Sequence, residues 1–272
     1  MIAHIEWRGK QLTVDLASGR SLAIMLDPHG SQPSFFASQP ASAKALHHDD
    51  YIGSVRQGGS CNAEVIQFAP HCHGTHTEGS GHISEQQLPV QEIIYPTPTL
   101  ARLITLTDTA LADCEEHVPG QAPSSTPLLT LAQIINRLDH QSLAHVEALL
   151  VRTLPNPEDK TRRDYAAEPV YPVFSSEALT WLSSQPLKHL LVDTPSLDPA
   201  HDQGRLTNHR QWWGGNARLE EDGLDPRRRS VTEMIYVPDD IQDGAYWLHL
   251  ELSPILSDAC SSRPVIYPMA DL

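Results

Sequence analysis

The sequence has few cysteines and no long apolar run. Its cysteines show no framework pattern, and a chain of 272 residues is large enough to need no covalent staples. We therefore expect reduced thiols at Cys61, Cys72, Cys114 and Cys260, which leaves Cys72 free to bind a metal. No apolar stretch approaches the roughly 20 residues that span a bilayer, and the N-terminus lacks the charged-then-apolar order of a signal peptide. These absences predict a soluble, cytoplasmic protein with no membrane partner.

Basic residues are also scarce. The chain has 19 Lys and Arg against 34 Asp and Glu, which gives a formal net charge of −15. A protein of this charge repels nucleic acid and anionic membrane surfaces, so we expect neither as a partner. The composition does not change between the two halves of the chain, and no repeat or long linker divides it. One domain over residues 1–272 is therefore predicted.

Histidine is plentiful, and it is concentrated in one segment. Residues 70–82 read PHCHGTHTEGSGH, which places four histidines, one cysteine and one glutamate in thirteen positions. Imidazole and thiolate groups suit zinc and its first-row neighbours, while a carboxylate can bridge two cations or hold a metal-bound water. The segment therefore indicates a metal centre with hydrolytic chemistry. A loop in which histidines cluster by chance is the simpler alternative.

Spacing within this segment predicts which side chains act together. In an extended chain, successive side chains point to opposite faces. Gly74 would lie on the ligand face, where it would let a metal or substrate approach the backbone. His71 and His73 would point to the other face. The ligand face would carry Cys72, His76, Glu78 and His82.

The remaining sequence combines strand and helix patterns. Residues 28–50 resemble an ordered loop, and Ser175 is placed to cap the second of two helices. Helix followed by strand occurs twice, which indicates an α/β arrangement. The predicted helices cover residues 130–138 and 175–182. The predicted strands cover residues 11–16, 21–26, 63–68, 99–106, 146–153, 189–193 and 231–237, the last of which contains Glu233.

Three separated segments resemble the cyclase family of metal-dependent hydrolases, which includes bacterial kynurenine formamidase and isatin hydrolase. The family signature His-x-Gly-Thr-His-x-Asp-x-Pro-x-His is matched at Gly74, Thr75, His76 and His82. Departures from it are Cys72 for the first histidine, Glu78 for the aspartate and Ser80 for the proline. Residues 191–198 (LVDTPSLD) resemble the family's Gly-Ile-Asp-x-Pro-Ser-Val-Asp segment, and residues 261–265 (SSRPV) resemble its Gly-Ser-Pro-Val-Arg region. This resemblance covers most of the chain and implies a mixed β-sheet core with flanking helices.

The resemblance also implies roles for individual residues. Metal ligands would be Cys72, His76 and Glu78, with His209 and Glu233 as distal ligands, and His82 would donate and accept protons. A one-residue bulge would exchange Cys72 for His71 or His73, so this ligand stays open. Because the arm of Glu78 is one methylene longer than that of aspartate, the number of ions, one or two, is open as well.

The implied activity is the hydrolysis of a small amide, formamide, lactam or lactone by water activated on zinc or manganese. The implied partners are a small-molecule substrate and further copies of the chain, in a homodimer or homotetramer. A catalytically inactive metal-binding or ligand-binding member of the same fold is one alternative. A structural module with incidental histidines is another.

Overall fold

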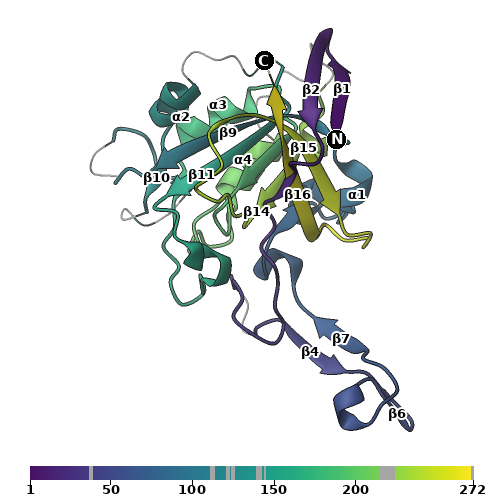
Figure 1. Cartoon of the computed structure of the whole chain (residues 1–272). Coiled ribbons are helices and arrows are strands. Elements are labelled where there is room, and N and C mark those ends of the chain that lie inside the picture. Colours follow the sequence, from purple (N-terminus) through teal and green to yellow (C-terminus); the bar gives the residue numbers. More distant parts are fainter. Residues whose placement is uncertain are drawn as a thin grey trace.

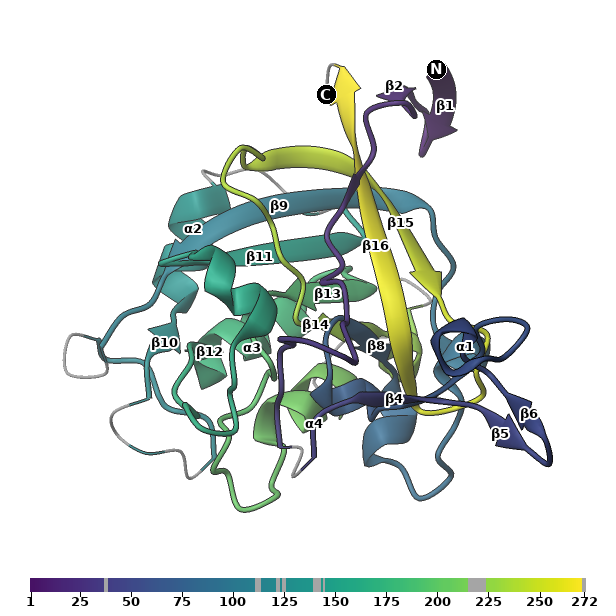
Figure 2. The same cartoon turned by 60° about the horizontal axis from the view of Figure 1, so that its bottom comes forward.

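The computed structural model describes residues 1–36, 39–110, 114–120, 123, 126–138, 143, 145–214 and 224–270. Its core is a mixed ten-stranded sheet in which β16 also pairs with β8 and so closes part of the sheet into a barrel-like ring. Figure 2 shows β16 crossing the sheet to reach β8. The order along the sheet is β1 (Ile2–Trp7), β2 (Lys10–Asp15), β16 (Ala259–Ala270), β15 (Gly244–Leu252), β9 (Thr99–Thr107), β11 (Ala148–Leu154), β13 (His189–Val192), β14 (Ser230–Glu233) and β8 (His76–Glu78), with β3 (Arg20–Ser21) paired to β16.

The centre of the sheet is apolar on both faces because helices and other strands cover it. Strands β9, β11, β13 and β14 are parallel, and β11 reads ALLVRTL with six of its seven residues buried. Leu149 and Val151 belong to the core under the helices, whereas Ala148 and Leu150 pack on the other face with Ile235. Both faces of the parallel strands are therefore packed, which holds these strands in place within the sheet.

Three helices cover one face of this sheet (Figure 1). They are α2 (Leu131–Leu138), α3 (Ser176–Ser183) and α4 (Thr207–Gly214). The Ser175 side chain caps α3 by accepting a hydrogen bond from the Ala178 backbone N–H at 3.0 Å, as predicted. In α4, Trp212 and Trp213 are buried among the core residues. No helix in the described part of the chain is long and apolar enough to cross a bilayer.

A narrow arm projects away from the sheet (Figure 1). Its strands β4 (Ser42–Ala45) and β7 (Glu64–Gln67) pair in antiparallel fashion, and β5 (His47–His48) pairs with β6 (Tyr51–Ile52) toward its tip. The arm also contains the 3₁₀ turn η1 (Val55–Gln57). The prediction of a loop over residues 28–50 is therefore wrong for β4 and β5. These residues have little β-propensity, so the local sequence does not indicate the two strands.

Most of the other predicted elements are confirmed. Helices 130–138 and 175–182 and strands 11–16, 63–68, 99–106, 146–153 and 189–193 are present within one or two residues. The strand predicted at 21–26 is wrong, because only Arg20–Ser21 pairs with β16 and Ala23 forms a single bridge. The strand predicted at 231–237 ends at Glu233, because Met234 has a φ of 53°.

Short elements complete the described chain. They are η2 (Pro70–Cys72), η3 (Ser80–Ile83), α1 (Val90–Ile93), β10 (Leu128–Leu129), η5 (Glu158–Arg162), β12 (Val173–Phe174) and η6 (Pro226–Arg228). Strands β10 and β12 form a parallel pair outside the main sheet. Residues 215–223, within the long connection between His209 and Glu233, lie outside the described residues.

Candidate metal centre

Strand β8 places the histidine segment in the middle of the sheet. It pairs antiparallel with β14, where His76 is opposite Glu233, and with β16, where Glu78 is opposite Ala259. His76 and Glu78 are two residues apart on one strand and therefore share a face. The sheet register thus brings three predicted site residues to one face, although the third is about 155 positions away in the sequence.

The segment before β8 is a turn and not the extended chain that we predicted. Residues 70–72 form the 3₁₀ turn η2, and Gly74 has a φ of 81°. A Cβ at Gly74 would meet only the Ile24 carbonyl oxygen, at 3.9 Å, so the glycine serves the left-handed backbone and not a close approach. Because the turn interrupts the alternation of faces, His71 is able to reach Glu78.

The inner part of the site is almost completely buried. The exposed fractions of His76, Glu78, His209 and Glu233 are 0%, 0%, 2% and 3%. The His76 Nε2 lies 3.2 Å from Glu233 Oε2. The His209 Nε2 lies 2.9 Å from Glu78 Oε1 and 3.4 Å from Glu233 Oε1. Two imidazoles therefore face two carboxylates that come from three different elements.

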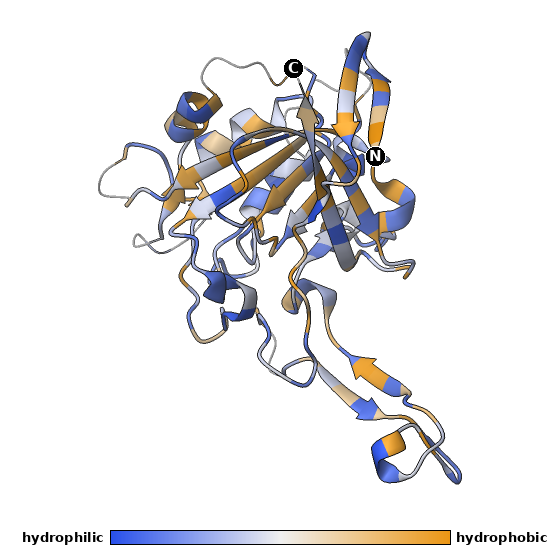
Figure 3. Cartoon of the chain, in the orientation of Figure 1, coloured by the Kyte–Doolittle hydropathy of each residue, from blue (hydrophilic) through white to orange (hydrophobic). Residues whose placement is uncertain are grey.

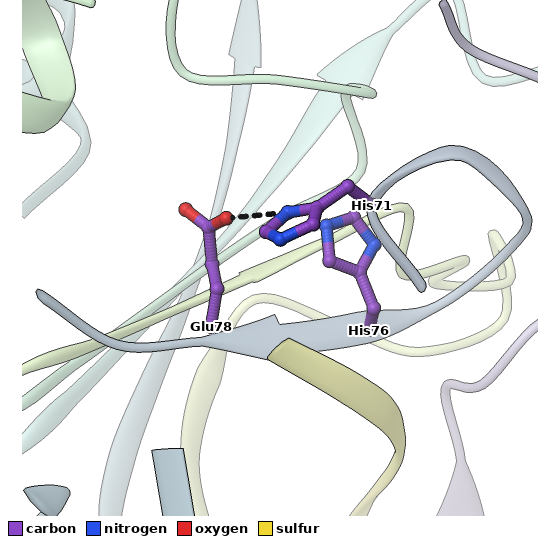
Figure 4. Close-up of side chains that lie close together, drawn as sticks. All are labelled: His71, His76 and Glu78. Carbon is purple, nitrogen blue, oxygen red and sulfur yellow. Dashed lines mark ion pairs between the residues drawn. The ribbon is translucent and has the colours of Figure 1, made fainter. Parts of the chain in front are cut away.

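A second, partly exposed group lies beside the inner one. His71 Nδ1 is 2.9 Å from Glu78 Oε2, as the dashed line in Figure 4 shows, and His82 Nε2 is 3.8 Å from the same oxygen. The side chains of His71, His82 and Asp258 are 29%, 25% and 28% exposed. Glu78 therefore stands between a buried half of the site and a half that solvent can reach.

Each of the four histidines turns one nitrogen toward the carboxylates of Glu78 or Glu233 and anchors the other. An anchored imidazole is held in one orientation, as is usual for histidines that bind metals. The anchoring contacts are His76 Nδ1 to the Gly74 carbonyl oxygen (3.1 Å), His209 Nδ1 to Asp198 Oδ2 (2.6 Å), His71 Nε2 to Asp258 Oδ2 (2.9 Å) and His82 Nδ1 to Asp258 Oδ2 (3.3 Å).

Opposite charges keep the buried groups ionised. Burial opposes the charge on Glu78, but the positive charges of His209 and His82 lower its pKa well below the ordinary value. Burial likewise opposes the charge on His209, yet the charge of Glu78 and the hydrogen bond with Asp198 raise its pKa well above the ordinary value. The buried carboxylates therefore draw positive charge into the protein interior.

The partly exposed half shows the same pattern. Burial is outweighed at His71, where the close contacts with the carboxylates of Asp258 and Glu78 raise the pKa to about 10. Hydrogen bonds from His71 and His82 lower the pKa of Asp258 below its usual range. A proton on His71 balances these carboxylates, and a cation could take its place.

The donor atoms fit a divalent metal. His76 Nε2, His209 Nε2 and both carboxylate oxygens of Glu78 are buried, and the close contacts that they make among the described residues are ion pairs without the alignment of hydrogen bonds. Such atoms are costly to bury unless something binds them. Imidazole nitrogens and carboxylate oxygens suit zinc and manganese. Within the described residues, the groups of donors close enough to hold an ion are His71, His76 and Glu78; Glu78, His82 and His209; and His71, His82 and Asp258.

The structure brings together five of the six residues predicted for the site, His76, Glu78, His82, His209 and Glu233. Neither Cys72 nor Glu233 belongs to these donor groups. Glu233 nevertheless contacts His76 and His209, whereas burial raises the pKa of the Cys72 thiol, which disfavours the thiolate. His73 contacts the backbone of Ala69 and Gln39. Of the flanking histidines that the sequence left open, the geometry therefore favours His71.

Two aspartates near the site were not predicted from the sequence. Asp198 accepts hydrogen bonds from the backbone N–H of Asn208 and His209, at 2.7 and 3.1 Å, and so caps α4 while it holds the His209 ring. The other aspartate of the LVDTPSLD segment, Asp193, pairs instead with buried Lys160 at 2.9 Å. Asp193 directly follows β13, whereas Asp198 lies further along the chain and contacts α4. Asp258 carries no comparable signal in the sequence.

Comparisons with known proteins agree with this architecture. A family model described as "Putative cyclase" matches residues 11–199. No curated protein matches the chain significantly in sequence. Isatin hydrolase A from Labrenzia aggregata, bound to benzyl benzoate, superposes with a TM-score of 0.59 at 15% identity, covering 92% of this chain and 93% of that chain. A predicted metal-dependent hydrolase from Bacillus stearothermophilus superposes with a TM-score of 0.57 at 12% identity, covering 92% and 97%. At these identities the two structures establish a shared fold.

Proposed function

Since the chain belongs to the cyclase family, we propose that it is a metal-dependent hydrolase that cleaves a small amide, formamide, lactam or lactone. The observation that carries this proposal is the convergence of imidazole nitrogens on the two buried carboxylates of Glu78 and Glu233. The orphaned donor atoms support a bound cation. The donor groups found among the described residues contain no sulfur, which leaves zinc and manganese both suitable. We propose zinc, with manganese as the alternative, and one or two ions.

Residues of the chain have separate tasks in this mechanism. His76, His209, Glu78 and Glu233 would hold the cation, and His71 would join them in place of Cys72. When bound, the ion supplies Lewis acidity, which polarises a carbonyl and acidifies a water molecule. His82 can exchange protons with solvent because its side chain is 25% exposed, while its Nε2 faces Glu78. It would therefore take a proton from the attacking water and pass one to the leaving group.

Metal analysis of untagged protein, combined with a screen of formamides, lactams and lactones, tests the proposal. We expect at least one first-row metal ion per chain, and turnover that a chelator abolishes and added zinc or manganese restores. Stoichiometric metal without turnover on any of these substrates would support an inactive, metal-binding member of the fold. Protein without metal would contradict the site itself.

We also propose that the chain forms a homodimer or homotetramer through its arm. Val65 and Ile66 on β7 are each 55% exposed, and Figure 3 shows the apolar colour of this strand. An isolated two-stranded ribbon is marginally stable in water, and exposed apolar groups favour an interface. Light scattering should give a multiple of the 30.1 kDa chain mass, and a Val65→Ser, Ile66→Ser double variant should shift the mass toward the monomer. A monomeric parent protein would contradict this proposal.

A further inference from the structure

Asp258 is held beside the site by the sheet register. It directly precedes β16, whose first residue, Ala259, is opposite Glu78. The Asp258 carbonyl oxygen accepts a hydrogen bond from the Gly79 N–H at 3.1 Å, and the Ser257 hydroxyl donates to Asp258 Oδ1 at 3.1 Å. These contacts fix the backbone and one carboxylate oxygen, and they leave Oδ2 for the histidines.

The Oδ2 atom contacts two imidazoles that have different predicted roles. It lies 2.9 Å from His71 Nε2 and 3.3 Å from His82 Nδ1. The two rings lie against each other, with centroids 4.2 Å apart and planes inclined by 31°. One carboxylate oxygen therefore controls the orientation of both rings.

These contacts select one tautomer for each ring in its neutral form, which is the form that His71 takes when a cation displaces its second proton. An ionised carboxylate only accepts hydrogen bonds, so His71 must carry its proton on Nε2 and His82 must carry its proton on Nδ1. The lone pairs are then on His71 Nδ1, 2.9 Å from Glu78 Oε2, and on His82 Nε2, 3.8 Å from the same oxygen. A metal ligand and a proton acceptor both need a lone pair at these positions.

We propose that Asp258 is a positioning residue that prepares His71 to bind the cation and His82 to accept a proton. The proposal rests on the function proposed above and adds a residue to it. Asp198 provides the comparison, since it holds one ring only, that of His209. Loss of Asp258 should therefore disturb two histidines, whereas loss of Asp198 should disturb one.

A second cation between His71, His82 and Asp258 is the competing interpretation of this group. The two contacts of Asp258 Oδ2 are aligned as hydrogen bonds, whereas the Nε2 atoms of His76 and His209 have no aligned partner among the described residues. A metal in this place would also require both nitrogens of His71 to bind cations. The geometry thus favours the positioning role, and zinc stoichiometry separates the two.

The test compares Asp258→Asn with the parent protein, with Ser257→Ala as the matched control. Zinc affinity is measured by competition with a chelator, and histidine tautomers are measured by nitrogen NMR of zinc-loaded protein labelled at histidine. We expect the Asn variant to bind zinc about 10- to 100-fold more weakly, as is typical when a residue that orients a metal ligand is lost. We also expect the signals of both His71 and His82 to change. Ser257→Ala removes the hydroxyl that holds Oδ1 but keeps the carboxylate, so it should weaken zinc binding less than Asp258→Asn and leave the tautomers as they are.

Asp258→Glu keeps the carboxylate and should retain more zinc affinity than Asp258→Asn. Asp198→Asn should weaken zinc binding and change the His209 signal while leaving His82 unaffected. Unchanged affinity and tautomers in Asp258→Asn would overturn the proposal, as would the loss of one of two bound zinc ions. Neither readout uses turnover, so zinc-binding protein that hydrolyses nothing would refute the proposed function and leave this inference standing.

Discussion

Two buried histidines contact opposite ends of β14, and their pKa values are shifted in opposite directions. His189, fully buried in β13, hydrogen-bonds to Ser230 at the start of β14 at 2.8 Å, and burial lowers its pKa to about 4. His209 contacts Glu233 at the end of β14 and is 2% exposed, yet its pKa is raised well above the ordinary value. Burial alone makes a histidine neutral, whereas the carboxylates around His209 draw in positive charge.

This difference explains what distinguishes the site from the rest of the core. Glu78, Asp198 and Glu233 all lie within 3.4 Å of a His209 nitrogen. Protons can balance these carboxylates, but a divalent ion that replaces the protons satisfies the orphaned donors as well. Because metal and protons compete for the same nitrogens, metal affinity should rise as the pH rises.

The largest effect on zinc binding should come from replacing His209, and replacing His189 should have none. His209→Ala deletes a ligand, and its zinc affinity should fall by more than the roughly 10- to 100-fold typical of losing an orienting residue. His189→Asn keeps a hydrogen-bonding group near Ser230 and should bind zinc as the parent does. Chelator competition measures both. Equal zinc affinity in the two variants would remove the distinction between these histidines.

A smaller effect on zinc binding is expected when the partly exposed half of the site is changed. His82→Ala should lower kcat by roughly 10²- to 10⁴-fold, the usual contribution of general acid–base catalysis. Zinc content should stay close to that of the parent protein, because the buried ligands remain. Turnover and elemental analysis are measured on the same preparation. If the variant instead lost its metal and kept its activity per bound metal, the assigned roles would be reversed.

The last change should leave zinc binding as it is, and it tests the neutral histidine through the stability of the fold. The native state protonates His189 only below about pH 4, whereas the unfolded chain does so below the ordinary 6.5. As the pH falls through this range the unfolded state binds the extra proton, which should lower the free energy of unfolding by about 3 kcal/mol. Above pH 6.5 this group should contribute no slope. Denaturant unfolding of His189→Asn should show a correspondingly weaker loss between pH 6.5 and 4; an identical loss would mean that His189 is not held neutral.

The sequence predicted those parts of the site that depend on local pattern or on family resemblance. His76, Glu78 and His82 lie in one short segment, and His209 and Glu233 followed from the resemblance. Alternation of side chains cannot predict that η2 and the positive φ of Gly74 interrupt the extended chain, so the alternation favours Cys72 over His71. The contacts of Asp258 depend on the pairing of β16 with β8, which no local pattern encodes.

The fold was predictable to a similar extent. Strands with apolar runs, such as β9 and β11, and the capped helix α3 have strong local signals. Strand β4 reads SAKA, which has little β-propensity, and it forms because β7 pairs with it. The barrel-like closure of the sheet is likewise a product of long-range pairing.

The most direct measurement of the central claim is anomalous scattering at the zinc absorption edge from a crystal of zinc-loaded protein. Our account predicts a peak at bonding distance from the Nε2 atoms of His76 and His209 and from the carboxylate of Glu78. A peak only at Cys72, or none among these side chains, would contradict it.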